Sequence, residues 1–140
     1  MNYTSFSGDE FKAFREIKDL RPLNMLNLVK VHKEVEYPDG EVVSGVEAYK
    51  RYGRLSFPIF AKLGGKIIWR GEMLFTLIGP SEEKWDECFI AQYPSVGAFV
   101  QMVRDPVYRE AVKHRQAAVL DSRLIRMAPA DAGTGFGKSG

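Results

Sequence analysis

Apolar residues recur at helical spacing in four parts of the chain, and each part predicts a helix. The first, residues 7–19, opens with a Ser-x-x-Glu capping box and ends before Pro22. The second, residues 44–63, opens with the same pattern and stops at paired glycines, and Pro58 inside it predicts a kink or a split into two helices. The third and fourth adjoin at Asp105-Pro106 and are expected over residues 95–104 and 106–120.

Apolar runs of strand length lie between these helices. They predict four strands, over residues 25–31, 66–70, 85–93 and 123–127. The second strand is expected to continue over residues 73–78 after a bulge or break at Gly71, and Asp121-Ser122 is expected to turn the chain into the fourth. The order matches the split βαβ plan, so we expect an α+β, ferredoxin-like βαββαβ fold, with an antiparallel four-stranded sheet and helices on one face.

The length of 140 residues suits one domain. Residues 22–129 are expected to form the ferredoxin-like domain, preceded by an N-terminal helical extension over residues 1–21. Residues 130–140 hold four glycines and almost no apolar side chains, so we expect a disordered tail.

The strands are apolar at consecutive positions, as in Ile67-Ile68-Trp69 and Phe89-Ile90-Ala91. A sheet with one hydrated face would alternate apolar and polar residues, so both faces of this sheet require cover. The helices of a ferredoxin-like fold cover one face, and a second copy of the chain is the simplest cover for the other. We therefore predict a homodimer formed through the sheet face, a dimeric α/β barrel. The alternative is that the N-terminal helix, residues 7–19, folds over that face within one chain.

Composition narrows the function classes. The net charge is +2, from 20 basic and 18 acidic residues, which gives no electrostatic case for nucleic-acid binding. Cys88 is the one cysteine, so an intrachain disulfide and a thiolate metal cluster are excluded, and it is interpreted as a small buried hydrophobe. The N-terminal residues lack a signal-peptide pattern, and no apolar run is long enough to span a membrane. These features predict a cytoplasmic protein without a membrane or nucleic-acid partner.

The residues also resemble a known family. The matching segments recur in order over residues 20–128, and they are Met25-Leu26-Asn27-Leu28, Glu47-Ala48-Tyr49, Tyr52-Gly53, Gly64-Gly65, Trp85-Asp86, Tyr93-Pro94-Ser95, Ala98-Phe99, Met102, Asp105-Pro106-x-Tyr108, Arg115-Gln116-Ala117-Ala118 and Asp121-Ser122-Arg123-Leu124. Together they resemble the domain-of-unknown-function family 1330, within the dimeric α/β-barrel superfamily. The resemblance implies a ferredoxin-like fold and a two-fold dimer, and it implies no activity. The superfamily is similar in fold to cofactor-independent monooxygenases and haem-binding proteins, but fold alone does not decide function.

Polar residues on strands and inner helix positions are the candidate site residues. Asn27 is interpreted as a ligand-orienting amide or as an amide satisfied by the backbone. Tyr49 and Tyr52 lie three residues apart, so their hydroxyls could converge on a pocket or their rings could simply pack in the core. Trp69 and Arg70 are candidates for substrate binding, with Arg70 either clamping a carboxylate or pairing with Asp86 or Glu72.

Two further residues are candidates for proton transfer. Asp86 could act as a general base or be a solvated strand-start carboxylate. His114 has the more suitable ordinary pKa, and its neighbour Arg115, a further substrate-binding candidate, points more toward the interior. His114 and His32 show no metal-ligand spacing, so no metal and no cofactor are predicted; a haem ligand role for His114 follows only from the superfamily analogy.

Two functions from different classes remain open at this point. One is a cofactor-independent enzyme that acts on a small organic acid or aromatic compound, with Asp86 and His114 as catalytic residues. The other is a non-catalytic dimer that binds a small ligand or a protein partner. They differ in geometry, because an enzyme requires its titratable groups to converge on a shared cavity.

Overall fold

The computed structural model describes residues 2–137. Its sheet has four antiparallel strands in the order β4-β5-β1-β6, with β1 (Leu23–Val31) and β5 (Glu87–Tyr93) in the centre and β4 (Lys66–Gly71) and β6 (Val119–Met127) at the edges. This is the predicted ferredoxin-like arrangement.

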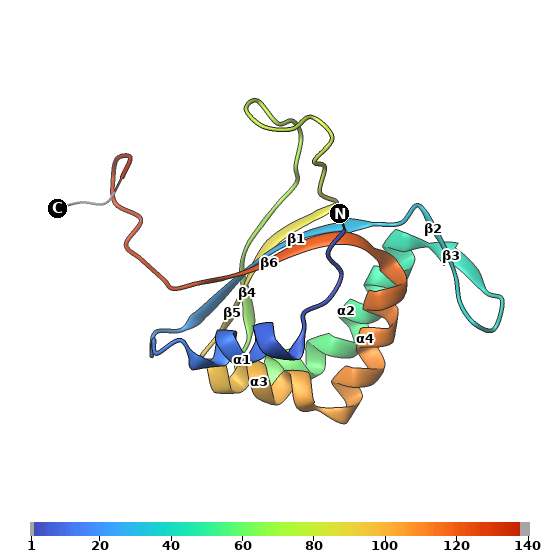
Figure 1. Cartoon of the computed structure of the whole chain (residues 1–140), viewed down its shortest axis with the longest axis horizontal. Helices are drawn as coiled ribbons and strands as arrows, with labels where there is room; N and C mark the ends of the chain where they lie inside the picture. Colours follow the sequence, from blue (N-terminus) through green and yellow to red (C-terminus); the bar gives the residue numbers. More distant parts are fainter. Residues whose placement is uncertain (1, 138–140) are drawn as a thin grey trace.

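Four helices cover one side of the sheet, as Figure 1 shows. They are α1 (Gly8–Glu16), α2 (Gly45–Lys62), α3 (Val96–Arg104) and α4 (Pro106–Ala118). The residues predicted to cap the N-termini of these helices do so. Each accepts a hydrogen bond from a backbone N–H in the first turn of its helix, and they are Ser7, Ser44, Ser95 and Asp105. Gly64 ends α2 with φ of 86°, a conformation that suits glycine.

The N-terminal helix α1 packs on the same side of the sheet as the other helices. The rings of Phe14 and Phe99 lie 5.2 Å apart, and Arg126 of β6 donates a hydrogen bond of 2.6 Å to the Phe14 carbonyl. The alternative in which this helix covers the other face of the sheet is therefore not the one the chain adopts.

Of the two outcomes expected at Pro58, a split does not occur, since α2 runs unbroken through it. Pro58 and Arg54, whose carbonyl loses its partner, are both exposed, so water can satisfy that carbonyl. Two other local expectations were wrong. Asp121 and Ser122 are not a turn but part of β6, which follows α4 directly. Residues 73–78 are not a strand.

We call residues 72–86, which include that segment, the arm. The arm leaves the sheet on the side opposite the helices, between β4 and β5 (Figure 1). A short hairpin that the sequence analysis did not predict pairs β2 (Glu34–Glu36) with β3 (Val42–Ser44), and the connection between them includes Gly40 with φ of 90°. The start of α2 lies so close to the chain after β1 that a Cβ on Gly45 would be 1.8 Å from the His32 carbonyl oxygen.

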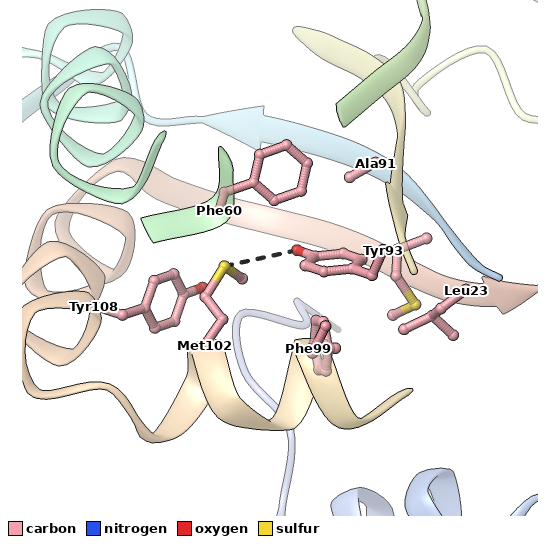
Figure 2. Close-up of a cluster of buried hydrophobic side chains, with 9 residues drawn as sticks. Leu23, Phe60, Ala91, Tyr93, Phe99, Met102 and Tyr108 are labelled. Atoms are coloured by element: carbon pink, nitrogen blue, oxygen red, sulfur yellow. Dashed lines mark hydrogen bonds between the residues drawn. The ribbon is translucent and has the colours of Figure 1, made fainter. Parts of the chain in front are cut away.

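The core lies between the sheet and the helices. Figure 2 shows side chains from β1, β5, α2, α3 and α4 meeting there, with the hydroxyl of Tyr93 directed at the sulfur of Met102, 4.0 Å away. The rings of Phe60 and Phe99 each pack edge-on against Tyr93 at 5.1 Å.

The register of the strands divides the sheet into two faces. Met25, Asn27, Phe89 and Ala91 point toward the helices, on what we call the inner face. The outer face holds the side chains at the alternate register positions. The apolar ones are Leu26, Leu28, Trp69, Ile90, Ile125 and Met127, and the polar ones include Asn24, Lys66, Gln92 and Arg123. The predicted tail has neither helix nor strand over residues 130–137, and residues 138–140 lie outside the described range.

Candidate functional site

A large cavity lies between the inner face of the sheet and the helices, with a volume of about 940 Å³. Its walls are mainly aromatic. They include Phe57 and Phe60 of α2, Phe89 and Tyr93 of β5, Phe99 of α3, and Phe11 and Phe14 of α1. An apolar hollow with a few polar groups is the usual form of a small-molecule site.

The N-terminal segment before α1 closes one side of this cavity. Tyr3 donates its N–H to the Asp121 carboxylate at 2.8 Å and accepts a hydrogen bond of 2.8 Å from the Ser122 hydroxyl. Arg115 donates to the Thr4 carbonyl at 2.7 Å. Residues from the extension and from the ferredoxin-like domain therefore form the cavity together.

Three tyrosines line the cavity from α2 and α4. The hydroxyls of Tyr52 and Tyr108 lie 2.7 Å apart and share a hydrogen bond, and the rings of Tyr49 and Tyr52 are 5.5 Å apart. The Tyr49 hydroxyl has no hydrogen-bond partner among residues 2–137, so it is available to a ligand. Burial raises the pKa of all three groups above the usual value, so at neutral pH they are protonated donors.

Asn27 lines the same cavity from the centre of the sheet. Its amide nitrogen donates to the Met25 carbonyl at 3.0 Å, which satisfies one donor through the backbone. The bond holds the side chain along its own strand, and the amide still reaches the cavity. The interpretation of Asn27 as an amide satisfied by the backbone thus holds for one donor, and its role toward a ligand stays a prediction.

A β-bulge decides which of Trp69 and Arg70 faces the cavity. Ile67 pairs with Ala91 and Trp69 pairs with Ile90, so Ile68 has no partner in β5. The extra residue reverses the alternation of faces from there on. Arg70 therefore lies on the inner face, with its guanidinium 5.2 Å from the Phe89 ring, and Trp69 lies on the outer face, away from the cavity.

Two of the four arginines that line the cavity, Arg70 and Arg115, differ in their partners. Arg70 forms an ion pair with Glu87 at 3.2 Å, rather than with Asp86 or Glu72. Arg115 donates to the Thr4 carbonyl and, at 3.4 Å, to the Ser122 hydroxyl, and no carboxylate among residues 2–137 pairs with it. Its charge acts on Tyr49, Tyr52 and Tyr108, where it partly offsets the effect of burial on their pKa values.

Asp86 and His114 do not line the cavity. The Asp86 carboxylate accepts the Val31 N–H at 2.9 Å at the base of the arm, and the Asp86 N–H donates to the Val29 carbonyl at 2.7 Å. His114 Nδ1 lies 2.7 Å from the Tyr37 hydroxyl, near the short hairpin. The two predicted proton-transfer residues thus lie apart from the other candidates. Asp86 anchors the base of the arm, and His114, although next to Arg115 in sequence, lies on a different side of α4.

Several cavity residues were missed by reasoning from the sequence. Tyr93 and Tyr108 were not among the predicted site residues, and Ser122 was expected to turn the chain into the last strand. The period of two along β5, with Phe89, Ala91 and Tyr93 on one face, was the signal that could have found Tyr93. Ser122 gave no such signal, because its partners are in the N-terminal segment.

Within residues 2–137, His, Cys, Asp and Glu side chains do not gather in a group that could hold a metal ion. None of the helices in this range is both long enough and apolar enough to cross a membrane.

Solved structures with a similar fold place the chain among known proteins. RPA0582, a protein of unknown function from Rhodopseudomonas palustris, is 53% identical. Its structure superposes with a TM-score of 0.89 over 94% of this chain and 99% of that chain, and the structure of methylated RPA0582 does so with a TM-score of 0.91 over 95% and 98%. SnoaB, a cofactor-independent oxygenase from Streptomyces nogalater, has a TM-score of 0.52 at 15% identity over 80% of this chain and 96% of that chain, which shows a shared fold alone.

Sequence comparison gives the family. No curated protein matches the chain. The family model for the domain of unknown function DUF1330 matches residues 42–127, from β3 to the end of β6, and so leaves out the strand that carries Asn27. The chain belongs to the DUF1330 family.

Proposed function

We propose that this protein binds a small aromatic molecule with an anionic group in the cavity between its sheet and its helices. The observation that carries the proposal is Arg115, a guanidinium group that reaches an aromatic cavity and has no carboxylate partner among residues 2–137. A cation in apolar surroundings is costly unless an anion or several acceptors compensate it. A bound carboxylate would supply that compensation.

The walls of the cavity suit the aromatic part of such a ligand. Aromatic rings prefer offset or edge-to-face contact with one another, and the rings of α1, α2, α3 and β5 surround the hollow. The volume of about 940 Å³ lies within the range of roughly 300–1,000 Å³ that is typical of small-molecule pockets.

The polar groups suit the acidic part. Arg115 can present two N–H groups to a carboxylate in the fork geometry that arginine favours. The free Tyr49 hydroxyl and the amide of Asn27 are further donors on the same cavity. Arg70 is a second cation, but Glu87 already holds it, so it is expected to contribute less.

Binding is favoured over catalysis because of where the titratable groups lie. The tyrosines of the cavity are held protonated by burial and therefore donate hydrogen bonds rather than remove protons. Asp86 and His114, the residues suggested for an enzyme that acts on an organic acid or aromatic compound, do not reach the cavity. Glu10 is the one carboxylate among the lining residues, and it caps α1.

We also propose that the protein is a homodimer joined through the outer face of the sheet. Trp69, Ile125 and Met127 on that face are 51%, 43% and 47% exposed, and no helix of residues 2–137 covers them. A two-fold pairing would hide the same surface on both copies. Light scattering at micromolar concentration should give twice the chain mass of 15.8 kDa, and a stable particle of single mass would refute the dimer.

Arg115→Met tests the ligand proposal, with 2-naphthoate and its neutral amide, 2-naphthamide, as probes in calorimetry. The wild type should bind naphthoate more tightly than naphthamide. The variant keeps the length of the side chain without its charge, so naphthoate affinity should fall at least about tenfold, the loss of one charge-assisted hydrogen bond. Naphthamide affinity should change little, which shows that the aromatic cavity is still formed.

Arg109→Met is the matched control, because Arg109 is also on α4 and borders the cavity but is exposed. Its naphthoate affinity should stay within about threefold of the wild type, since exposed charges contribute little. Equal losses in both variants would show general attraction rather than a site, and an Arg115→Met variant that binds naphthoate like the wild type would overturn the assignment.

A further inference from the structure

We propose that the arm, residues 72–86, is a clasp that buries its apolar side chains against a second copy of this chain, beside the paired outer faces. This inference rests on the homodimer proposed above and goes beyond it, because it assigns a role to a segment that lies outside the sheet.

The arm exposes a larger contiguous apolar surface than monomeric soluble proteins usually do. Leu74, Phe75, Leu77 and Ile78 are 85%, 81%, 86% and 93% exposed, within five consecutive positions. Single exposed hydrophobic residues are common on soluble proteins, but a contiguous group of large ones marks a contact surface.

The base of the arm is fixed while its apolar part is free. Asp86 bonds to Val29 and Val31 of β1, and the Arg123 guanidinium lies 5.2 Å from the Trp85 ring. Beyond this base, no hydrogen bond or ion pair joins residues 74–84 to the rest of residues 2–137. The arm is therefore held in one direction, away from the helices and past the outer face, as Figure 1 shows.

The arm would enlarge the surface that a dimer through the outer face buries. The four strands have six to nine residues and lie about 4.8 Å apart, so the outer face covers roughly 500 Å² in projection, and a stable interface buries about 800 Å² of accessible surface on each partner. The arm adds four large apolar side chains on the side of the sheet where the second copy would lie. Two arms related by a two-fold axis would close the assembly without leaving either arm exposed.

The charge of the arm favours a second copy over a lipid surface as the occupant. The arm carries four acidic residues, Glu72, Glu82, Glu83 and Asp86, against one basic residue, Lys84. Segments that bind anionic membranes are basic, and an acidic arm would be repelled from them. The outer face of a second copy instead offers an apolar centre, formed by Leu26, Ile90 and Ile125, which matches the side chains that the arm presents.

Sedimentation analysis of full-length variants tests the clasp. Phe75→Ser with Leu77→Ser should raise the dissociation constant of the dimer at least about 100-fold. Burial of each side chain of this size lowers that constant about tenfold or more. Leu74→Ser with Ile78→Ser is a second pair and should act in the same direction. Glu82→Ser with Lys84→Ser, at exposed polar positions of the arm, is the control and should change it less than about threefold.

The outcomes separate the clasp from the dimer itself. A wild type that is monomeric at all concentrations overturns both proposals. A dimeric wild type whose two serine pairs dimerise as tightly overturns the clasp and leaves the dimer. Co-sedimentation of the wild type with vesicles of phosphatidylcholine and phosphatidylglycerol, lost in Phe75→Ser with Leu77→Ser, would make the arm a lipid contact and also overturn the clasp. Circular dichroism should show all variants folded, because the altered side chains are exposed.

Discussion

The inner and outer faces of the sheet are both apolar, but the chain covers only one of them. On the inner face, four helices and the N-terminal segment enclose a core and a cavity, so that Leu23, Met25 and Ala91 are buried. On the outer face, Trp69, Ile125 and Met127 remain about half exposed, next to an arm whose Leu74, Phe75, Leu77 and Ile78 are more than 80% exposed. The inner face thus stabilises the single chain, whereas the outer face is the surface that the proposed dimer would cover.

The largest expected effect comes from removing a ring on the inner side. Phe99→Ala should lower the free energy of unfolding by about 3–5 kcal/mol, because Phe99 is 6% exposed and packs against Phe14 and Tyr93. The measurement is denaturant unfolding under conditions where the protein is monomeric. Phe75→Ala on the arm is the control and should change monomer stability by less than about 0.5 kcal/mol. Similar losses in both variants would break the distinction between the two sides.

The close approach of α2 to the chain after β1 predicts the next effect. Gly45→Ala should destabilise the protein by about 3 kcal/mol, because the new methyl group would overlap the His32 carbonyl, which is backbone and cannot rotate away. Gly53→Ala in the same helix has no atom within 4 Å of its added Cβ, so it should stabilise the protein by about 0.5–1 kcal/mol. Thermal unfolding of the two variants compares them directly, and a tolerated Gly45→Ala would mean that α2 lies farther from the sheet.

A smaller effect is expected from the helix cap between α3 and α4. The Asp105 carboxylate accepts the N–H groups of Val107 and Tyr108 at 2.7 and 3.2 Å. Asp105→Ala should therefore lower the free energy of unfolding by about 1 kcal/mol, and Asp105→Asn by less, since an amide oxygen still accepts these bonds. Denaturant titration measures both. Equal losses in the two variants would indicate that charge, rather than capping, is what Asp105 contributes.

Tyr49→Phe is expected to change the free energy of unfolding least at neutral pH. Its main effect should be on the pH at which the protein unfolds in alkali. Burial raises the pKa of Tyr49, Tyr52, Tyr93 and Tyr108 above the usual value of 10.0. Above pH 10 the unfolded chain therefore holds fewer protons than the folded one, so stability is full below that pH and falls as the pH rises beyond it. Tyr49→Phe removes one such group and should move alkaline unfolding to higher pH, with a change under about 0.5 kcal/mol at neutral pH.

Tyr52→Phe is the comparison for this prediction, because it leaves the Tyr108 hydroxyl without its partner. It should cost about 1 kcal/mol at neutral pH. Unfolding followed by circular dichroism across the pH range, together with tyrosinate absorbance, distinguishes the two variants. Alkaline unfolding at the same pH in the wild type and Tyr49→Phe would contradict the buried environment of Tyr49.

Local signals in the sequence were reliable where a few neighbouring residues decide the structure. The capping residues Ser7, Ser44 and Asp105 start their helices, and Gly64 ends α2, because each satisfies or terminates backbone groups within one turn. The same kind of reasoning failed for residues 73–78, whose apolar pattern predicts a strand. No strand of residues 2–137 lies beside this segment to accept its backbone bonds.

The candidate site was predictable only in part. Asn27, Tyr49, Tyr52, Arg70 and Arg115 line one cavity, as a search for polar residues on strands and inner helix positions indicates. Trp69 was placed with Arg70 because the bulge at Ile68 cannot be recognised from spacing. Asp86 and His114 were chosen for their chemistry, and chemistry does not determine which way a side chain points.

The fold class, the helix ends and the presence of more apolar strand surface than one layer of helices can hide could all be inferred from the sequence. These follow from periodicity and composition, which act over short distances along the chain. It took the folded chain to show that α1 joins the other helices, that Arg115 donates to Thr4 across 111 residues of sequence, and that the arm points away from the core. Such contacts depend on how distant segments pack, and no local pattern encodes that.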